Sequence, residues 1–289
     1  MQRSEKVKYQ VQQLKQLPAL STTVTQLLAM LSDENLEIDE LASVIERDPT
    51  LTARIIGLAN AAYFAQTRPI TSVSEAIIRV LGLQMVKTLA LSIALCGAFN
   101  TSRCPGFKLD EYWFRAFGSA QLARKLVLRM DAKLRPDADQ VYLTALLRDI
   151  GVLVLVHEFP EEYALVVAEL NQEPDLDPEA LEQRHVGISS RQAGEWLTDR
   201  WHLPRFIVHA IAGRDGILTQ ETPHSPAIQV IALILDWLHQ PQQGALCSLF
   251  ENSRLGQDIN LSAEQLNNIE VDFIQQIEEI KEIAKLLAT

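Results

Sequence analysis

Residues 38–62 read IDELASVIERDPTLTARIIGLANAA, and this stretch indicates two consecutive helices. Asp48 and Pro49 mark the start of the second helix, because Asp caps free backbone N–H groups and Pro lacks an N–H that the first helical position leaves unused. On both sides of this pair, apolar residues recur at helical spacing and form one face of each helix. They are Ile38, Leu41, Ala42, Ile45, Leu51, Ile55, Leu58, Ala59 and Ala62.

The same helix-start signals recur along the rest of the chain, whereas strand signals are scarce. Further Asp-Pro and Ser-Pro pairs and Ser-x-x-Glu/Gln capping boxes begin at Asp177, Ser225, Ser72, Ser189 and Ser262. Gly82 stands where a left-handed cap would end the helix that begins at Val73. The apolar run Val152–Val156 allows a short strand, but its position between helical segments favours a buried helix. We therefore predict an all-α fold, a multi-helix bundle.

The composition of the 289-residue chain fits this fold class. Apolar residues make up 47% and charged residues 22%, a balance that excludes an intrinsically disordered chain. Only 12 Gly and 12 Pro are present, which disfavours a turn-rich β-sandwich. Loops at residues 100–109 and 171–178 interrupt the helical pattern. We expect an N-terminal helical subdomain at residues 1–105 and a second at residues 106–289, with one shared core.

The formal net charge of −11 disfavours nucleic acid as a partner, because an acidic surface repels phosphate backbones. Basic residues are densest between residues 115 and 135, where we interpret them as a solvent-exposed helix face. They are Arg115, Arg124, Lys125, Arg129, Lys133 and Arg135.

Cysteine usage and hydropathy indicate a soluble protein of a reducing compartment. The three cysteines form no Cys-x-x-Cys pair, which argues against a disulfide framework and against a zinc ribbon. The N-terminal segment lacks the apolar region of a secretion signal. The most apolar stretch, residues 89–99, is about half the length that spans a bilayer and predicts a buried core helix. We expect a cytoplasmic protein with no membrane partner.

Asp149 and Asp236 are the candidate site residues that the pattern itself singles out. Each lies within an apolar stretch, and buried carboxylates are rare unless a cation or a metal binds them. Asp149 follows Arg148, so Asp149 could either form a structural ion pair or be a metal ligand. Two carboxylates without a certain histidine partner make a thin magnesium site and a poor site for a transition metal. No phosphate-binding loop, nucleophile elbow or His-Glu-x-x-His motif is present.

Most of the chain, from about residue 14 to about residue 215, resembles the HDOD domain, a bacterial relative of the HD metal-dependent phosphohydrolases. The resemblance rests on LPALSTTVTQLLAML, on IDELASVIERDPTLTARIIGLANAAYF and on ITSVSEAIIRVLGLQMVKTLAL in the first half. In the second half, LLRDIGVLVL is similar to the HD segment, and GISSRQAGEWLTDRWHLPRFIVHAI to the helix pair that follows it. It implies that residues 106–289 form an HD-like helical subdomain with additional C-terminal helices.

The resemblance also implies which residues stand at the metal-ligand positions of active HD enzymes, namely a first His, a His-Asp doublet, further His residues and a final Asp. Gly118 stands near the first position, and Arg148 and Asp149 stand at the doublet. Ser190 stands at a later His position and Asp236 at the final Asp. Glycine offers no ligand, and a guanidinium is a permanent cation that cannot coordinate a metal. The resemblance therefore implies a degenerate site.

We expect from this resemblance a non-catalytic bacterial signal-transduction or scaffold protein that binds other signalling proteins. No catalytic residue, cofactor or stoichiometric metal is expected. One alternative is a metal-dependent phosphohydrolase that uses Asp149 and Asp236 with unorthodox ligands such as His185 or His209. Another is a sensor whose former catalytic cleft binds a small anion through Arg148.

Asn60 lies near the end of the helix that begins after Asp48. Its neighbours are small or apolar, so we expect it at the edge of the core. A side-chain amide in this position is expected to hydrogen-bond the backbone of a neighbouring segment.

Overall fold

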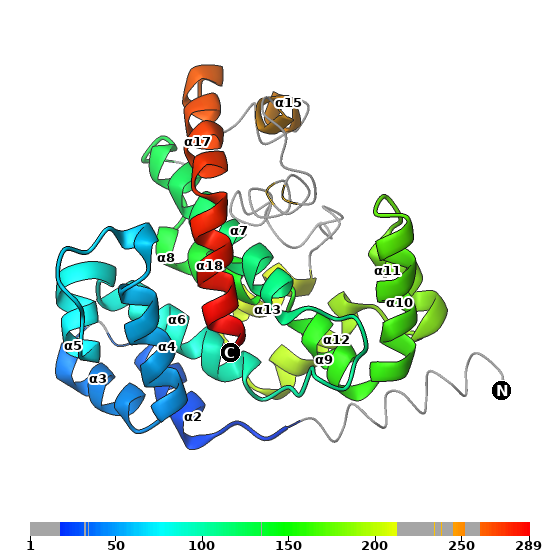
Figure 1. Cartoon of the computed structure of the whole chain (residues 1–289), viewed down its shortest axis with the longest axis horizontal. Helices are drawn as coiled ribbons and strands as arrows, with labels where there is room; N and C mark the ends of the chain where they lie inside the picture. Colours follow the sequence, from blue (N-terminus) through cyan, green and yellow to red (C-terminus); the bar gives the residue numbers. More distant parts are fainter. Residues whose placement is uncertain are drawn as a thin grey trace.

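The computed structural model of the chain describes residues 18–31, 33, 35–133, 135–212, 234, 238, 245–251 and 261–289. Every regular element in these residues is helical, as Figure 1 shows. The predicted all-α fold is confirmed. The run Val152–Val156 lies within a buried helix, as the sequence favoured.

The first helices of the chain gather on one side of the molecule, drawn in blue and cyan in Figure 1. Among them, α6 is buried along most of its length and contacts α2, α4 and α8. This confirms the prediction of a buried helix around residues 89–99. The elements are α2 (Thr22–Met30), α3 (Ile38–Glu46), α4 (Pro49–Ala59), the 3-10 turn η1 (Ala62–Phe64), α5 (Val73–Ala76), the π-helical turn η2 (Ile77–Leu81) and α6 (Leu83–Cys96).

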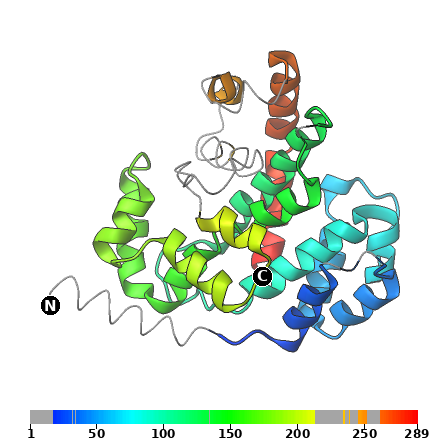
Figure 2. The same ribbon diagram turned by 180° about the vertical axis from the view of Figure 1, so that it is seen from behind.

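Among the remaining helices, α7 is the longest element of the described chain and contacts α8, α17 and α18. Helices α10 and α11 form a hairpin that extends away from the first helices, and Figure 2 shows α12 and α13 from behind. The elements are α7 (Leu109–Arg129), α8 (Ala138–Leu147), α9 (Ile150–Glu158), α10 (Pro160–Gln172), α11 (Pro178–His185), α12 (Ser190–Arg200), α13 (Arg205–Ala212), α15 (Ala245–Glu251), α17 (Ala263–Gln275) and α18 (Ile277–Ala288).

Helix α18 connects the two groups of helices. It lies along α7 and also contacts α4, where a terminal carbon of Leu286 lies beside Gly57. Buried apolar residues of both groups belong to one continuous hydrophobic core. A loop separates α6 from α7 near residue 105, and the division of the chain at that position stays a prediction.

Most of the predicted helix starts have the expected capping bonds. The Asp48 carboxylate accepts hydrogen bonds from the N–H groups of residues 50 and 51, and Asp177 accepts one from residue 179. Ser189 and Ser262 form complete capping boxes with the Gln three residues later. The predicted start at Ser225 lies outside the described residues.

Two cap predictions differ from the structure in detail. Ser72 caps α5 by accepting a hydrogen bond from the N–H of Glu75. The Glu75 carboxylate, however, binds the N–H and hydroxyl of Thr71 in place of the Ser72 backbone expected for a capping box. Gly82 ends the preceding helix with a φ of 79° and a ψ of 157°, so its ψ is extended and the expected left-handed cap is wrong. Glycine remains suited to this position because of its positive φ.

Asn60 forms the backbone contact that was predicted for it. Its Nδ2 donates to the carbonyl of Ile70 at 2.9 Å, and its Oδ1 accepts from the Ile70 N–H at 2.8 Å. The amide therefore holds the chain after η1 against the C-terminal end of α4.

One helical stretch in the described part of the chain, Ala138–Glu158, is long and apolar enough to cross a membrane. In its most apolar window, 78% of the residues are buried inside the protein. This stretch covers α8 and α9 and forms part of the core.

Candidate functional site

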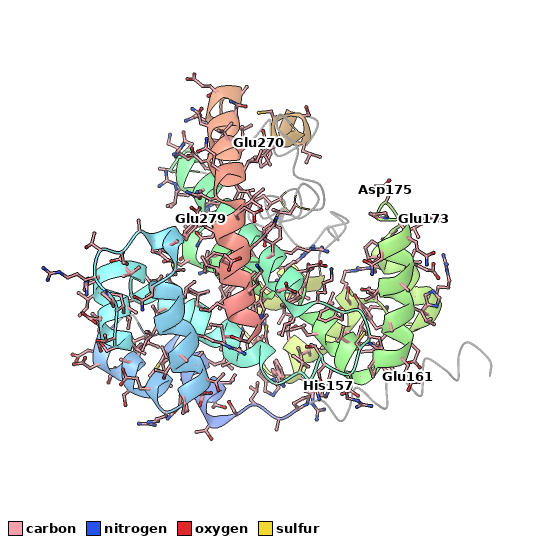
Figure 3. All side chains as sticks on the ribbon, in the orientation of Figure 1. His157, Glu161, Glu173, Asp175, Glu270 and Glu279 are labelled. Atoms are coloured by element: carbon pink, nitrogen blue, oxygen red, sulfur yellow. The ribbon has the colours of Figure 1, made fainter. Side chains whose placement is uncertain are left out.

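A cavity of about 240 Å³ lies between α7, the start of α9 and the hairpin of α10 and α11. Helix α7 contributes Glu111, Tyr112 and Arg115, which lie on one side of the helix because residues three and four positions apart share a helix face. Lys108, immediately before α7, lies on the same wall. Figure 3 shows Glu173 and Asp175 at the outer tip of the hairpin and Glu161 near its base. Leu170, Asn171 and Pro174 line the cavity on the part of the hairpin near that tip.

Asp149 lies on the inner wall of this cavity, between the end of α8 and the start of α9. Its side chain is 12% exposed, and its Oδ2 lies 3.5 Å from Nη2 of Arg115, whose side chain is 31% exposed. Arg115 thus provides the basic partner that a largely buried carboxylate needs. The sequence had placed Arg115 on a solvent-exposed helix face, and this interpretation is wrong for this residue, because it lines the cavity.

Arg148 points away from the cavity although it precedes Asp149 directly. It is 5% exposed, and its Nη1 donates a hydrogen bond to the carbonyl of Ala210 in α13. Arg148 caps the end of α8 and Asp149 precedes α9, and the backbone turns between them, which accounts for the different directions of the two side chains. Arg148 does not appear among the described residues that line the cavity. The expectation that it would bind an anion in the cleft therefore does not fit its position.

Glu182 on α11 forms another part of the cavity wall and connects it to Ser190. The Glu182 side chain is almost fully buried, and its Oε2 accepts a hydrogen bond from the Ser190 N–H at 2.7 Å. Its Oε1 accepts one from the Tyr163 hydroxyl at 3.4 Å. Burial, and then the charge of Glu182, raises the pKa of Tyr163 well above its ordinary value, so this phenol stays protonated as a donor.

Two glycines bring the segments of Asp149 and Ser190 together. Gly151 in α9 lies so close to α12 that a Cβ atom there would overlap the carbonyl of Ser190 and lie 2.7 Å from the Gly194 nitrogen. A Cβ atom on Gly194 would in turn lie 2.8 Å from Ile211. Only residues without a side chain permit this close crossing of α9 and α12.

Gly118 lies three residues after Arg115 on α7, but its surroundings are filled. A Cβ atom at this position would lie 3.2 Å from Cζ of Phe273 in α17 and 3.8 Å from Cδ1 of Leu238. The space that a histidine would need here is occupied by apolar side chains.

The residues that the HD resemblance places at ligand positions do not fit a two-metal centre. Of the five positions, Gly118 offers no donor and Arg148 a cation, and Asp236 lies outside the described residues. His185 has its Nε2 2.7 Å from Oε1 of Glu169, and His209 is exposed on α13. Among the described residues, no group of three or more His, Cys, Asp or Glu side chains could hold a metal ion. We therefore derive no metal-dependent step for this site.

A family model for the HDOD domain matches residues 17–216. The chain belongs to the HDOD domain family. The resemblance predicted from the sequence is thus confirmed over more than half of the chain, in both groups of helices.

Solved structures share the fold of this HDOD protein. A protein of Marinobacter aquaeolei VT8, provisionally named a signal transduction protein, has a TM-score of 0.79 at 24% identity and is matched over 100% of this chain and 67% of its own. An HDOD domain protein of unknown function from Geobacter sulfurreducens has a TM-score of 0.74 at 24% identity, over 97% and 99% of the two chains. A provisionally named phosphohydrolase of Shewanella amazonensis SB2B has a TM-score of 0.74 at 23% identity, over 96% and 97%. At these identities the likeness shows the fold alone.

A curated relative comes from Treponema pallidum (strain Nichols), where it is of uncharacterised function. It is 22% identical over 217 residues, which are 75% of this chain and 41% of that protein. This HDOD chain thus spans less than half the length of the curated relative that it matches.

Sequence reasoning found Asp149 but missed most of the cavity around it. The spacing of Lys108, Glu111, Tyr112 and Arg115 on one helix face was a signal that could have been found. Glu182 lies in the segment EALEQRH, whose polar composition gives no sign that its carboxylate is buried.

Proposed function

We propose that this HDOD protein is a non-catalytic signalling module of the bacterial cytoplasm that acts by binding other signalling proteins. The observation that carries the proposal is the use of Arg148, which the HD resemblance places at the His position of the doublet. Its buried guanidinium donates to the Ala210 carbonyl and so joins α8 to α13. A cation in that position opposes metal binding and serves the packing of the helices.

The surroundings of Gly118 and Ser190 support the same proposal. Phe273 packs against Gly118, and the Ser190 backbone N–H binds the Glu182 carboxylate. These positions therefore contribute packing and backbone hydrogen bonds, whereas a phosphohydrolase needs several neutral or anionic donors around its metal ions. The likeness to a structure provisionally named for signal transduction agrees with this role.

The second candidate is a metal-dependent phosphohydrolase with an unorthodox site. Asp149 lies on the wall of a cavity, as a catalytic carboxylate would, and the Shewanella amazonensis SB2B structure is provisionally named a phosphohydrolase. The candidate needs Asp236, His185 or His209 to supply further ligands. His185 on α11 instead lies against Glu169 on α10, within the hairpin.

A metal and activity assay distinguishes the two candidates. Wild type, Asp149→Asn and Arg148→His would be compared for metal content by elemental analysis and for hydrolysis of bis(p-nitrophenyl) phosphate with added Mn²⁺. Asp139→Asn is a matched control, because Asp139 forms an ion pair with Arg124 of α7 at the same 3.5 Å distance, outside the cavity. We expect no metal-dependent turnover in any of the four proteins. Turnover in wild type that is lost in Asp149→Asn alone would establish the enzyme.

A further inference from the structure

The Arg115 guanidinium is a cation with hydrogen-bond donors to spare on the wall of the cavity. Its Nε is buried and, within the described part of the chain, has no hydrogen-bond partner. Its Nη2 lies 3.5 Å from the Asp149 carboxylate, which is an ion-pair contact too long for a strong hydrogen bond. Arginine has five N–H donors and binds carboxylates through two of them at once. The terminal nitrogens of Arg115 at this wall can therefore donate to a further hydrogen-bond acceptor.

The rest of the cavity suits an apolar or aromatic body. Phe107, Tyr112 and Tyr163 contribute rings, and Val152, Val167 and Leu170 contribute aliphatic side chains. The volume of about 240 Å³ suits a small organic molecule. Ligand sites in proteins commonly combine such a lining with a few polar groups that fix orientation.

The charges around the cavity disfavour an acceptor with more than one negative charge. The described lining carries three carboxylates, of Glu111, Asp149 and Glu182, against two cations, of Lys108 and Arg115. Lys108 lies 2.7 Å from Glu111 at the exposed rim, so Arg115 is the cation that faces inward with donors to spare. A phosphate dianion would meet more carboxylates than cations. An organic cation would leave the Arg115 donors unused.

We propose that this cavity binds a small organic monocarboxylate, whose carboxylate accepts hydrogen bonds from Arg115 and whose apolar body lies among the rings of Phe107, Tyr112 and Tyr163. The bound monocarboxylate would serve as the input signal of the signalling module, and this role rests on the proposed function. Binding itself depends only on the cavity. It differs from the anion site expected at Arg148, because a different residue supplies the cation.

Titration of the full chain with three probes of similar shape tests the proposal. Ligand-observed NMR would compare sodium benzoate, a monoanion, with benzamidine, a cation, and phenyl phosphate, a dianion at pH about 7.5. We expect benzoate to bind in the millimolar range or tighter, phenyl phosphate to bind several-fold more weakly, and benzamidine not to bind. Benzamidine that binds more tightly than benzoate would overturn the proposal, as would no benzoate binding up to about 10 mM.

Two variants and one control locate the benzoate site. Arg115→Gln is expected to weaken benzoate binding tenfold or more, because it removes charged donors. Arg124→Gln on the same helix removes an arginine with an ion pair of equal length outside the cavity, and we expect unchanged binding. Equal binding by wild type and Arg115→Gln would overturn the proposal.

Val167→Phe keeps Arg115 and fills part of the cavity, so it tests the site independently if Arg115→Gln does not fold. We expect it to abolish benzoate binding with a melting temperature close to that of wild type. A folded Val167→Phe protein that binds benzoate as wild type does would contradict the cavity as the site. If benzoate does not bind, the monocarboxylate site is excluded, but the metal and hydrolysis assays still test the proposed function. Failure of this inference and failure of the proposed function are therefore distinguishable.

Discussion

Two neighbouring regions of α7 differ in what fills the space beside the helix. Beside Gly118, the side chains of Phe273 and Leu238 approach the helix to van der Waals distance. Beside Arg115, less than one turn away, a cavity remains open between α7 and the α10–α11 hairpin. Both regions adjoin positions where the HD resemblance places metal ligands. The structure therefore combines close packing beside Gly118 with an open, polar-walled cavity beside Asp149.

The largest effect is expected where the closely packed region is tightest, at the crossing of α9 and α12. Gly151→Ala should reduce the free energy of unfolding by about 3 kcal/mol, because the new Cβ would overlap the backbone of Ser190. Urea denaturation measures the loss. Gly57→Ala is the control, since its Cβ would meet only the flexible end of Leu286, and its free energy should change by less than about 1 kcal/mol. Equal effects of the two substitutions would contradict the backbone contact.

A histidine at position 118 tests whether the space beside α7 is closed. Gly118→His should reduce the free energy of unfolding by about 2 kcal/mol, because the imidazole must displace the Phe273 ring. In a double-mutant cycle with Phe273→Ala, the two losses should be less than additive, because the smaller residue removes the clash. Strict additivity would mean that the two side chains do not meet.

The open region is expected to tolerate substitution better. Asp149→Asn should reduce the free energy of unfolding by about 1–2 kcal/mol, less than the about 3–5 kcal/mol of a fully buried pair. The reason is that both partners retain solvent contact and lie 3.5 Å apart. Asp139→Asn, at a more exposed pair of the same length, should change it by less than about 0.5 kcal/mol. A loss of about 4 kcal/mol in Asp149→Asn would mean that this carboxylate belongs to a fully buried ion pair and that the region around it is as closely packed as that around Gly118.

The smallest effect concerns the opposite end of α9, where Glu158 lies near His157. Burial raises the pKa of the Glu158 carboxyl, and the nearby His157 partly offsets the rise. The folded protein therefore holds this proton more tightly than the unfolded chain, so the stability that it contributes is present at low pH and is lost as the pH rises through the raised pKa. Glu158→Gln should be more stable than wild type at neutral pH by less than about 1 kcal/mol, and equal to it near pH 4. Melting temperatures across this range that show no convergence would contradict the shift.

The sequence predicted those features that depend on nearby residues. Asp48-Pro49 and the boxes at Ser189 and Ser262 start helices because capping involves residues two or three positions apart. The need of Asp149 for a cation was also predictable, because it followed from burial.

The direction of Arg148 and the identity of the Asp149 partner could not be predicted. Arg148 binds a carbonyl in α13, and Asp149 lies near Arg115 of α7, so both contacts depend on how distant helices pack. The cavity depends on packing in the same way. Asp236 was singled out by its apolar surroundings, and its predicted place at the site lies outside the described residues.

The contact between α4 and α18 determines how this chain can fold. Gly57 and Leu286 are in contact although about 230 residues separate them in the chain. Closing so long a loop costs chain entropy before the packing contacts offset that cost. Such contacts therefore form late and slow folding. Helices α2 to α6 also contact one another over short separations in the sequence and so can assemble sooner. We expect α18 to dock late during refolding, when α4 and α7 already provide the surface on which it lies.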